Sequence, residues 1–490
     1  MHSTARLHSE AVRGIISAGG YVPYRRLDRS EIATFFGSGG GRGTRSVASY
    51  DEDTTTMGIE AARLALRSAS DGAEPDALWF ATANPAYLEK TNATAIHAAL
   101  RLDQLTPAID TGGAVRSGVG SLRAALDGRG SVLVVTADLR GGLPTSTDEA
   151  AGGDGAAAVL VDDDDEDAPV IAELIGAASA TEEFIDRWRT PGDVNVKQWE
   201  ERFGETKYLP LGEQAWNAAL KAAELTPEQV DRVIVSGTHA RANRSIKSRL
   251  GTAKEAAVDD LSASVGNTAT AQAGMLLAAA LEAAEPGEVI ALVSLVDGAD
   301  VLVFRTTDAI ASYTPARSVA TQVDNGAPVP YGRFLAWRRV VTVDPPRRPE
   351  PDRISAAVAG RTADWKYAFE GSRDESSGTL HLPPQRVSRE GGTIDEMEPA
   401  PMSDVAGTIA TFTIDRIAYS PSPPIVFAVV DFDHGGRLPI ELTDVEADDL
   451  TIGDRVEMTF RKLFTADGIH NYFWKARPIR AERPDPQGRK

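Results

Sequence analysis

Two stretches of this 490-residue chain repeat one pattern: an amphipathic helix rich in Ala and Leu, a short polar spacer and an apolar strand. They cover 60–87 and 213–242. A second pair follows, because 118–138 and 270–300 each combine a small-residue helix, a Gly turn, an apolar strand and an Asp. Continuous apolar strands that alternate with helices are typical of parallel strands covered on both faces. We therefore expect residues 1–307 to fold as one α/β architecture used twice in tandem.

The chain changes character after Thr307. The segment that follows is rich in Pro, Arg, Gly and Ser, which is typical of a linker. The last ninety or so residues consist of five short β-strand patterns separated by Gly-containing turns, and this favours a small barrel of the OB type. We therefore predict an N-terminal half, a C-terminal half, a linker and a barrel, with these bounds: 1–170, 171–307, 308–401 and 402–490.

The composition restricts the functions open to the chain. Its 71 Asp and Glu residues outnumber its 51 Lys and Arg residues, and the net charge of −20 argues against general nucleic-acid binding. The chain has no cysteine, which excludes disulfides, thiolate zinc sites and thiol catalysis. No apolar run reaches the ~18 residues of a membrane span, and the first residues lack the apolar stretch of a secretory signal. We expect a cytoplasmic protein with no membrane partner.

Five motifs of the first part of the chain stand out: GIISAGGYVPYRRL (14–27), DEDTTTMGIEAARLAL (51–66), GGDGAAAVLV (152–161), RWRTPGD (187–193) and VGNTATAQAGMLLAAALEAAEPGE (265–288). They resemble motifs of the 3-hydroxy-3-methylglutaryl-CoA synthase branch of the thiolase superfamily. Near the C-terminus, KYAFEGSR, GTLHLPPQRV and NYFWKARP resemble the OB-fold and zinc-ribbon domain that pairs with thiolase-like enzymes. The resemblance implies a duplicated, five-layered thiolase-type α/β core followed by an all-β OB-fold domain.

The same resemblance implies partners and ligands. The substrate would be a coenzyme A thioester, and no cofactor would be bound permanently. Members of the superfamily pair through the core, so a homodimer is expected. A larger complex with another thiolase-like subunit is the alternative assembly.

The chain departs from the family at the positions that carry its chemistry. The family's nucleophilic cysteine falls on Val115, and its general-acid glutamate falls on Ala83 or Asn84. Covalent acyl transfer is therefore expected to be lost. Ser117 is a poor substitute, because it lies two residues from that register and an alkoxide needs a base within reach. The family's four zinc-binding cysteines fall on residues that supply no thiolate, so no zinc is expected: Asp374, Ser377, Ser388 and Gly391. The resemblance thus implies that 308–401 contains a linker and a degenerate zinc ribbon.

Two family positions are retained. His239, in SGTHARA, matches the family's histidine, and Asn267, in VGNTAT, matches its asparagine. Hydrogen bonds from these side chains to a thioester oxygen would stabilise an enolate, each by roughly 3–4 kcal/mol. The alternatives are a structural histidine and a helix N-cap. Tyr87, in the loop after the strand whose acid is missing, is a candidate proton donor.

Basic residues follow His239. Arg241, Arg244 and Lys247 are spaced to share one helical face and would bind the phosphates of coenzyme A, although a solvated helix face is the alternative. Asp138 and Asp297 end matching strands. The resemblance places such loops near the site, but an Asp at a strand end is commonly a turn former.

Two hypotheses about function follow. In the first, the protein makes or breaks a carbon–carbon bond of an acyl-CoA thioester by aldol, retro-aldol or decarboxylation chemistry, with no covalent acyl-enzyme. In the second, it is an inactive scaffold or an acyl-CoA-binding subunit of a thiolase-like complex. Substitution of His239 and Asn267 distinguishes the two, because it would abolish turnover in the first and leave binding nearly unchanged in the second.

Overall fold

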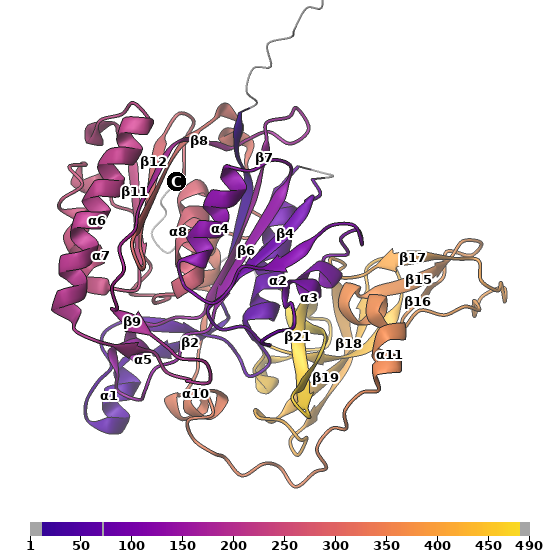
Figure 1. Ribbon diagram of the computed structural model, residues 1–490. Coiled ribbons are helices and arrows are strands. Elements are labelled where there is room, and N and C mark those ends of the chain that lie inside the picture. Colours follow the sequence, from indigo (N-terminus) through magenta and orange to yellow (C-terminus); the bar gives the residue numbers. More distant parts are fainter. Residues whose placement is uncertain (1–11, 71–72, 481–490) are drawn as a thin grey trace, which may run out of the picture.

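The computed structural model describes residues 12–70 and 73–480, and its core consists of two similar halves (Figure 1). The strands of the first half lie in the order β5-β4-β6-β7-β1. Their bounds are β1 (Arg13–Tyr21), β4 (Ala77–Ala81), β5 (Ala108–Asp110), β6 (Val132–Asp138) and β7 (Gly155–Asp163). Residues 1–11, on which the expectation about a secretory signal rests, lie outside the described part.

The second half repeats the strand order of the first, as β11-β12-β13-β8. Its strands are β8 (Ala172–Ala180), β11 (Arg232–Gly237), β12 (Val289–Leu295) and β13 (Ala299–Thr306). An isolated parallel bridge between Val233 and Ala257 stands where the first half has β5. β1 and β8 pair through Gly14 and Ile15, so the halves share one nine-stranded sheet. Gly14 is required there, because a Cβ would lie 2.2 Å from the carbonyl oxygen of Ala172.

The expected duplication is confirmed, but the expectation of purely parallel strands is wrong for part of each half. β4 runs parallel to β5 and β6, and β11 runs parallel to β12. In contrast, β7 is antiparallel to β6 and β1, and β13 is antiparallel to β12 and β8. The reason lies in the connections. β12 turns directly into β13 at 296–298, and the segment 139–154 between β6 and β7 is a loop with one short helix, so no crossover helix returns the chain to the other end of the sheet.

Helices form three layers around the two halves of the sheet. α2 contacts β1, β6 and β7 on the outer face of the first half, and α6 contacts β8, β12 and β13 on the outer face of the second. α4 and α8 contact each other between the halves, where α8 touches β1 and β7 on one side and β11 and β12 on the other. The result is the five-layered core. The helices are α2 (Thr54–Ser68), α3 (Ala93–Ala99), α4 (Ser117–Leu126), α6 (Glu201–Ala222), α7 (Ala240–Lys247) and α8 (Gln272–Leu281).

α2 begins at a capping box and is buried on most sides. The Asp53 side chain accepts a hydrogen bond from Thr56 N at 3.0 Å, and the Thr56 hydroxyl accepts one from Asp53 N at 2.8 Å. Residues 54–65 are all buried, because the sheet covers one side of α2 and the C-terminal barrel contacts another. A Cβ on Gly19 of β1 would lie 2.5 Å from Ala65 N, so this glycine allows the close approach of helix and strand.

Short elements complete the core and lead to the C-terminal part. They are β2 (Arg25–Asp28), α1 (Ser30–Phe36), β3 (Thr44–Val47), α5 (Thr147–Ala151), β9 (Arg187–Trp188), β10 (Lys197–Gln198), α9 (Val319–Asp324), β14 (Ala327–Pro328), α10 (Tyr331–Trp337) and α11 (Ala356–Arg361). No helix in residues 12–70 or 73–480 is both long and apolar enough to cross a membrane.

A three-stranded sheet and a closed barrel end the chain. The sheet contains β15 (Glu370–Asp374), β16 (Leu380–His381) and β17 (Met397–Pro401). The barrel closes in the order β18-β19-β20-β22-β21. Its strands are β18 (Gly407–Asp415), β19 (Ile425–Phe432), β20 (Arg437–Leu442), β21 (Arg455–Ala466) and β22 (Ile469–Pro478). The five strands expected from the sequence are therefore present. The barrel lies at the lower right of the molecule in Figure 1.

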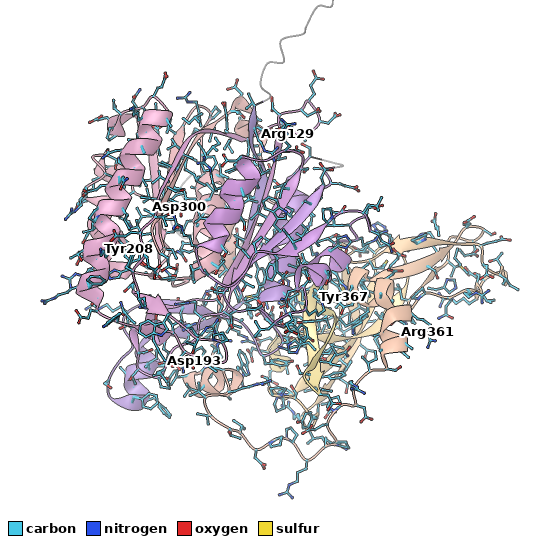
Figure 2. All side chains as sticks on the ribbon, viewed as in Figure 1. Arg129, Asp193, Tyr208, Asp300, Arg361 and Tyr367 are labelled. Carbon is cyan, nitrogen blue, oxygen red and sulfur yellow. The ribbon has the colours of Figure 1, made fainter. Side chains whose placement is uncertain are left out.

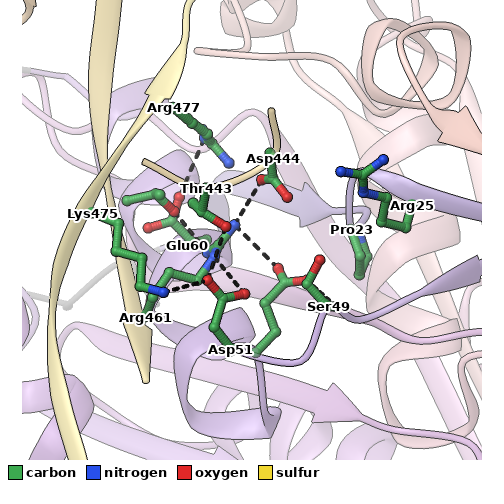
Figure 3. A network of polar contacts seen from close by, with 12 residues as sticks. Pro23, Arg25, Ser49, Asp51, Glu60, Thr443, Asp444, Arg461, Lys475 and Arg477 are labelled. Carbon is green, nitrogen blue, oxygen red and sulfur yellow. Dashed lines mark hydrogen bonds and ion pairs between the residues drawn. The ribbon is translucent and has the colours of Figure 1, made fainter. Parts of the chain in front are cut away.

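A buried charged network fixes the barrel to the first half. We call it the seam and define it as Asp51, Glu52, Asp444, Arg461 and Lys475. Figure 3 labels Asp51, Asp444, Arg461 and Lys475. The N–O distances from Arg461 are 3.0 Å to Asp444, 3.3 Å to Glu52 and 3.8 Å to Asp51, and Lys475 Nζ lies 3.0 Å from Asp51. Burial raises the pKa of Glu52 to about 7. Burial opposes ionisation of Asp51 as well, but Lys475 and Arg461 outweigh it and lower its pKa. The barrel and the core are thus joined by ion pairs as well as by apolar contacts.

Candidate functional site

A cavity of about 1030 Å³ opens where the strands of both halves end. Its walls are the loops that follow β4, β6, β11 and β12, the turn before α4, and the long segment between β8 and α6. In open α/β sheets, ligands bind at the carboxyl ends of the strands, and this cavity has that position. The main wall segments are 82–85, 87–92, 112–115, 138–141 and 187–194.

The turn before α4 forms one wall and presents no nucleophile. Val115 lines the cavity at the position to which the resemblance assigns the cysteine. Gly112 lets the turn approach β4, because a Cβ there would lie 2.9 Å from the carbonyl oxygen of Thr82. The next residue, Arg116, is an anchor: its Nε lies 2.8 Å from Asp300 Oδ2 and its Nη1 donates to Asp297 O at 2.8 Å (Asp300 is labelled in Figure 2). The turn is thus held against the second half of the core.

A guanidinium lies where the family would place its acid. Arg189 lines the cavity and donates through Nη1 to Asn84 Oδ1 at 3.2 Å and through Nη2 to the carbonyl oxygen of Ala83. Within the described residues, it has no carboxylate within 4.0 Å. In contrast, Arg140 and Arg187 on the same walls share Asp148, at 3.7 Å and 2.5 Å. The end of β4 therefore offers an unpaired cation in place of a carboxyl group.

Two carboxyl groups occupy equivalent places in the two halves. Asp138 ends β6, Asp297 follows β12, and both line the cavity. Burial raises the pKa of both groups, and the neighbouring Asp186 raises that of Asp297 further. The Asp138 carboxylate accepts a hydrogen bond from Thr270 Oγ1 at 2.9 Å, whereas Asp297 is exposed. Carboxyl groups with raised pKa values in a cavity are candidate proton donors and acceptors. From the sequence alone, the position of these two residues at strand ends is consistent both with proton transfer and with turn formation.

His239 is buried and fully hydrogen-bonded outside the cavity wall. It is the N-cap residue of α7, and its Nδ1 accepts from Ala242 N at 3.0 Å. Its Nε2 lies 2.8 Å from the carbonyl oxygen of Glu201. The neighbouring Thr238 lines the cavity, and His239 does not. Both ring nitrogens are therefore committed to backbone groups.

Asn267 lies close to the same loop and is held in a similar way. Its Nδ2 donates to Gly237 O at 2.7 Å, and its Oδ1 accepts from Ala269 N at 2.9 Å. Asn243 donates to the same Gly237 oxygen at 2.8 Å. The structure therefore brings Asn267 to the loop that carries His239, but neither side chain is part of the cavity lining.

A buried carboxylate lies beside His239. Asp186 is 1% exposed, and within the described part of the chain neither of its carboxylate oxygens has a hydrogen-bond partner. A Cβ on Gly204 of α6 would lie 2.7 Å from Asp186 Oδ1 and 2.9 Å from His239 Cδ2, so both side chains face this glycine. Burial and Asp186 raise the pKa of Tyr208 (labelled in Figure 2). Asp186 precedes RWRTPGD, but no local sequence pattern showed that it would be buried.

Tyr87 lines the cavity and contacts the barrel. Its hydroxyl oxygen accepts a hydrogen bond from His470 N at 2.7 Å, and the two rings are 4.9 Å apart. His470 lies on β22, and its Nδ1 is 2.8 Å from Thr465 Oγ1. Burial lowers the pKa of the His470 ring. The hairpin of β21 and β22 thus supports the wall that Tyr87 forms, and no pattern in the sequence predicts this contact.

The three basic residues predicted to bind phosphates lie on α7, away from the lining. Arg241 pairs with Glu205 at 2.6 Å, and Lys247 pairs with Asp260 at 3.2 Å. Arg244 is exposed and pairs with no carboxylate of residues 12–70 or 73–480. Of the three, Arg244 is the one whose charge is available to a ligand.

The degenerate ribbon is held by hydrogen bonds around one carboxylate. Asp374 is buried and accepts from Ser377 Oγ, from Thr393 Oγ1 at 2.8 Å and from Ser376 N at 3.3 Å. These donors, with Ser388, keep the pKa of Asp374 well below its usual value. The residues here do not fit a zinc ion, because serine and glycine supply no thiolate. Across the described segments, no three His, Cys, Asp or Glu side chains are grouped closely enough to hold a metal.

Comparisons with known proteins agree with the fold. Residues 220–301 match the family described as 3-oxoacyl-[acyl-carrier-protein] synthase III C terminal, and residues 400–461 match the family described as ChsH2, C-terminal OB-fold domain. The chain is 30% identical over 294 residues to the hydroxymethylglutaryl-CoA synthase of Thermococcus sibiricus, covering 58% of this chain and 83% of that protein. It is 27% identical over 344 residues to that of Methanopyrus kandleri, covering 66% of this chain and 97% of that protein.

Solved structures show the same architecture. MvaS in complex with 3-hydroxy-3-methylglutaryl coenzyme A superposes with a TM-score of 0.55 at 18% identity, covering 80% of this chain and 99% of that one. The 3-oxoacyl-(acyl carrier protein) synthase III of Pseudomonas aeruginosa superposes with a TM-score of 0.52 at 20% identity, covering 60% of this chain and 98% of that one. At these identities the two structures support the fold alone.

Proposed function

This chain belongs to the hydroxymethylglutaryl-CoA synthase family, and we propose that it makes or breaks a carbon–carbon bond of an acyl-CoA thioester without forming an acyl-enzyme. The observation that carries the proposal is the cavity wall at Val115 in a chain with no cysteine. With no thiol to accept the acyl group, the thioester stays on coenzyme A. The enolate then forms on the bound thioester itself, as in aldol, retro-aldol or decarboxylation chemistry.

The side chains that line the cavity supply the chemistry in this proposal. Asp297 is exposed to the cavity and has a raised pKa, so it moves the proton at the α-carbon of the thioester. Tyr87 keeps its phenolic proton available as a donor, because its oxygen accepts from His470 N. His239 and Asn267 hold the loop after β11 through backbone hydrogen bonds and so act as positioning residues.

Coenzyme A and oligomeric state complete the proposal. Arg244 contributes to phosphate binding, and Arg241 and Lys247 join it if they exchange their carboxylate partners for phosphate.

β5 leaves one edge of the sheet without a partner strand in the described chain, and Ile109 there is 47% exposed. A second copy that pairs at this edge would give a homodimer. Light scattering that gives the mass of one chain at micromolar concentration would contradict the dimer.

The test of the function is proton exchange. In D₂O with butyryl-CoA, the enolate mechanism predicts enzyme-dependent deuterium incorporation at the α-carbon, followed by mass spectrometry. Asp297→Asn should slow the exchange at least tenfold, whereas Asp127→Asn, an exposed change on the C-cap of α4, should not. A covalent acyl adduct on the protein, or binding of no CoA species in calorimetry, would overturn the proposal.

A second candidate function is binding without turnover, as a scaffold or subunit of a thiolase-like complex. It is favoured by one observation: the polar atoms of His239 and Asn267 are already engaged by backbone groups. Acyl-CoA binding with no exchange above the rate in buffer would select this function.

A further inference from the structure

A second cavity, of about 170 Å³, lies between the barrel and the core, and it shares no lining residue with the first. Its core side is formed by β2, the segment before α2 and α10, and its barrel side by the segments after β18 and β20. A single water needs only about 10–15 Å³, so the cavity has room for a small molecular ligand. The polar groups of its lining indicate the class of that ligand.

Arg25 places a buried guanidinium in this lining. The residue is 7% exposed, and its Nε has no hydrogen-bond acceptor in residues 12–70 and 73–480. Glu446 is its one carboxylate partner in those segments, with an oxygen 2.5 Å from Nη1, and the Glu446 side chain is 54% exposed. A buried cation is unfavourable without an anion, and the carboxylate that pairs with this one is free to turn into solvent. An anion that enters the cavity can therefore take the place of Glu446.

Two further polar atoms of the lining are buried without a partner in the described chain. Trp337 Nε1, at the end of α10, is a donor without an acceptor, and Asp444 Oδ1, after β20, is an acceptor without a donor. The other Asp444 oxygen accepts from Arg461 at 3.0 Å, which holds the carboxylate in place. Figure 3 labels Arg25 and Asp444, and no dashed line joins them. Because unpartnered buried groups cost free energy, the fitting ligand accepts hydrogen bonds from Arg25 and Trp337 and donates one to Asp444.

Two exposed arginines at the same cavity favour an anionic ligand. Arg333, on α10, pairs with no carboxylate in the described ranges, and Arg416 lies 3.9 Å from Asp448, whose side chain is 93% exposed. The donors of the lining thus belong to three separate elements: β2, α10 and the segment after β18. A tetrahedral oxyanion has oxygens in several directions to accept from such donors, whereas the two oxygens of a carboxylate lie in one plane.

Asp444 distinguishes among the tetrahedral anions. Sulfate carries no proton near neutral pH, so it has nothing to donate to a carboxylate and is repelled by it. A phosphate monoester has a second pKa of about 6 and is largely deprotonated there as well. Inorganic phosphate keeps at least one P–OH group near neutral pH, and this group can donate to Asp444 Oδ1.

We propose that this cavity is a binding site for inorganic phosphate, in which the ion accepts hydrogen bonds from the buried and rim donors and donates its P–OH to Asp444. The site is separate from the acyl-CoA cavity, so the inference goes beyond the proposed function and does not depend on it. Because the lining comes from both sides of the barrel interface, the bound ion contacts the core and the barrel at once. Phosphate should therefore stabilise the docked barrel.

Calorimetry of the full chain with three anions at equal ionic strength tests the site. Near neutral pH, inorganic phosphate should bind at least about tenfold more tightly than sulfate or glycerol 3-phosphate. Phosphate at about 10 mM should raise the melting temperature by about 2 °C or more over the same concentration of sulfate. Equal affinity for phosphate and sulfate, or no phosphate binding at that concentration, would overturn the site and leave the proposed function untouched.

Variants of the lining and a matched control locate the binding. Arg333→Gln and Trp337→Phe should each weaken phosphate binding at least about fivefold. Glu446→Gln should tighten it, because Arg25 loses its competing partner. The control is Arg339→Gln, which removes the same charge two residues beyond α10 at a position outside the lining. If the control weakens binding as much as Arg333→Gln does, general surface charge attracts the phosphate and the site is overturned.

Asp444→Asn tests the selectivity between the anions. An amide donates as well as accepts, so this variant should bind sulfate at least about fivefold more tightly than wild type does. Asp444 also belongs to the seam, so circular dichroism checks the fold before the titration, and if the variant is unfolded, Arg333→Gln and Trp337→Phe decide the question. Unchanged sulfate affinity in the folded variant would overturn the assignment of Asp444 as the acceptor of the phosphate proton.

Discussion

The seam and the cavity are both rich in charged side chains, but they use them in opposite ways. In the seam, Arg461 and Lys475 are completely buried, and each has at least two carboxylates within 4.0 Å. In the cavity, Arg189 has no such carboxylate within the described residues, and Asp297 is exposed with a raised pKa. Paired buried charges hold two parts of a fold in register, whereas unpaired charges at an open wall retain the capacity to bind or to exchange protons.

The largest effect should come from breaking the seam. Arg461→Met leaves Asp51, Glu52 and Asp444 buried without their shared cation, which should lower the free energy of unfolding by about 3–5 kcal/mol. Urea unfolding of the full chain measures this. Arg437→Met, which breaks an exposed pair with Asp431 on the same barrel, should cost about 0–1 kcal/mol. Equal costs for the two variants would contradict the assignment of the seam.

The polar cluster around Asp374 in the ribbon differs from the seam, because its hydrogen-bond donors are neutral groups and not buried cations. Asp374→Ala removes the acceptor shared by Ser377, Thr393 and Ser376, so the loops of the ribbon should open more often and be cleaved about tenfold faster by trypsin. The control is a chelator: EDTA should leave the melting temperature and the cleavage rate of wild type unchanged. A fall of several degrees with EDTA would show that metal holds the ribbon.

The pH dependence of stability distinguishes the carboxylates of the barrel interface. Glu52 has a pKa of about 7, above the ~4.3 of an unfolded chain, so the folded state holds this proton more tightly. The contribution of Glu52 to the free energy of unfolding is therefore complete below pH ~4.3, where the carboxyl group is protonated in both states. This contribution is lost as the pH rises to about 7. The free energy of unfolding of Glu52→Gln, measured relative to wild type in urea, should therefore rise by about 2–3 kcal/mol between pH 5 and pH 8.

A neighbouring glutamate provides the matched control for Glu52. Burial would raise the pKa of Glu60, but Arg63 and Arg477 outweigh it and lower the pKa to about 2. Glu60 is thus ionised in the folded and the unfolded chain between pH 5 and pH 8. The effect of Glu60→Gln on the free energy of unfolding should be the same at both pH values. A pH-dependent effect for Glu60→Gln and a constant one for Glu52→Gln would reverse the assignment.

The smallest effect concerns the contact between barrel and cavity. Tyr87→Phe removes the acceptor of the His470 amide, which should cost about 0.5–1.5 kcal/mol of stability. It should also raise the dissociation constant for butyryl-CoA about two- to fivefold, because the phenolic donor is lost. Ile469→Ala changes an exposed side chain on the same hairpin and should affect neither quantity. Unchanged affinity in Tyr87→Phe would remove Tyr87 from the proposed chemistry.

The sequence predicted the repeated architecture well, because apolar periodicity is a local property. The patterns at 60–87 and 213–242 became α2 with β4 and α6 with β11, and the five strands of the barrel lie where the sequence patterns predict them. Strand direction was predicted less well. It depends on whether a crossover helix or a tight turn joins two apolar strands, and the turn at 296–298 was not recognised as a reversal.

The candidate site was predictable only in outline. Its walls follow from strand ends, and the sequence indicates Tyr87, Asp138 and Asp297, which do line the cavity. The contacts of His239 were not predictable, because its partner Glu201 is 38 residues away on the helix that packs beside α7. The unpaired charge of Arg189, within RWRTPGD, was not predictable, because it depends on which carboxylates the fold brings within reach among the described residues.

By itself, the sequence determined that the core is a duplicated α/β fold, that a small barrel follows it, and that the chain has no cysteine thiol to act as a nucleophile. Only the tertiary structure decided which charges are paired. Arg461 meets Glu52 across more than 400 positions of sequence, and Arg189 meets Ala83 across 106. The physical reason is that hydrophobic patterning acts along neighbouring residues, whereas the free energy of a charge is set by whichever side chains and water the fold brings around it.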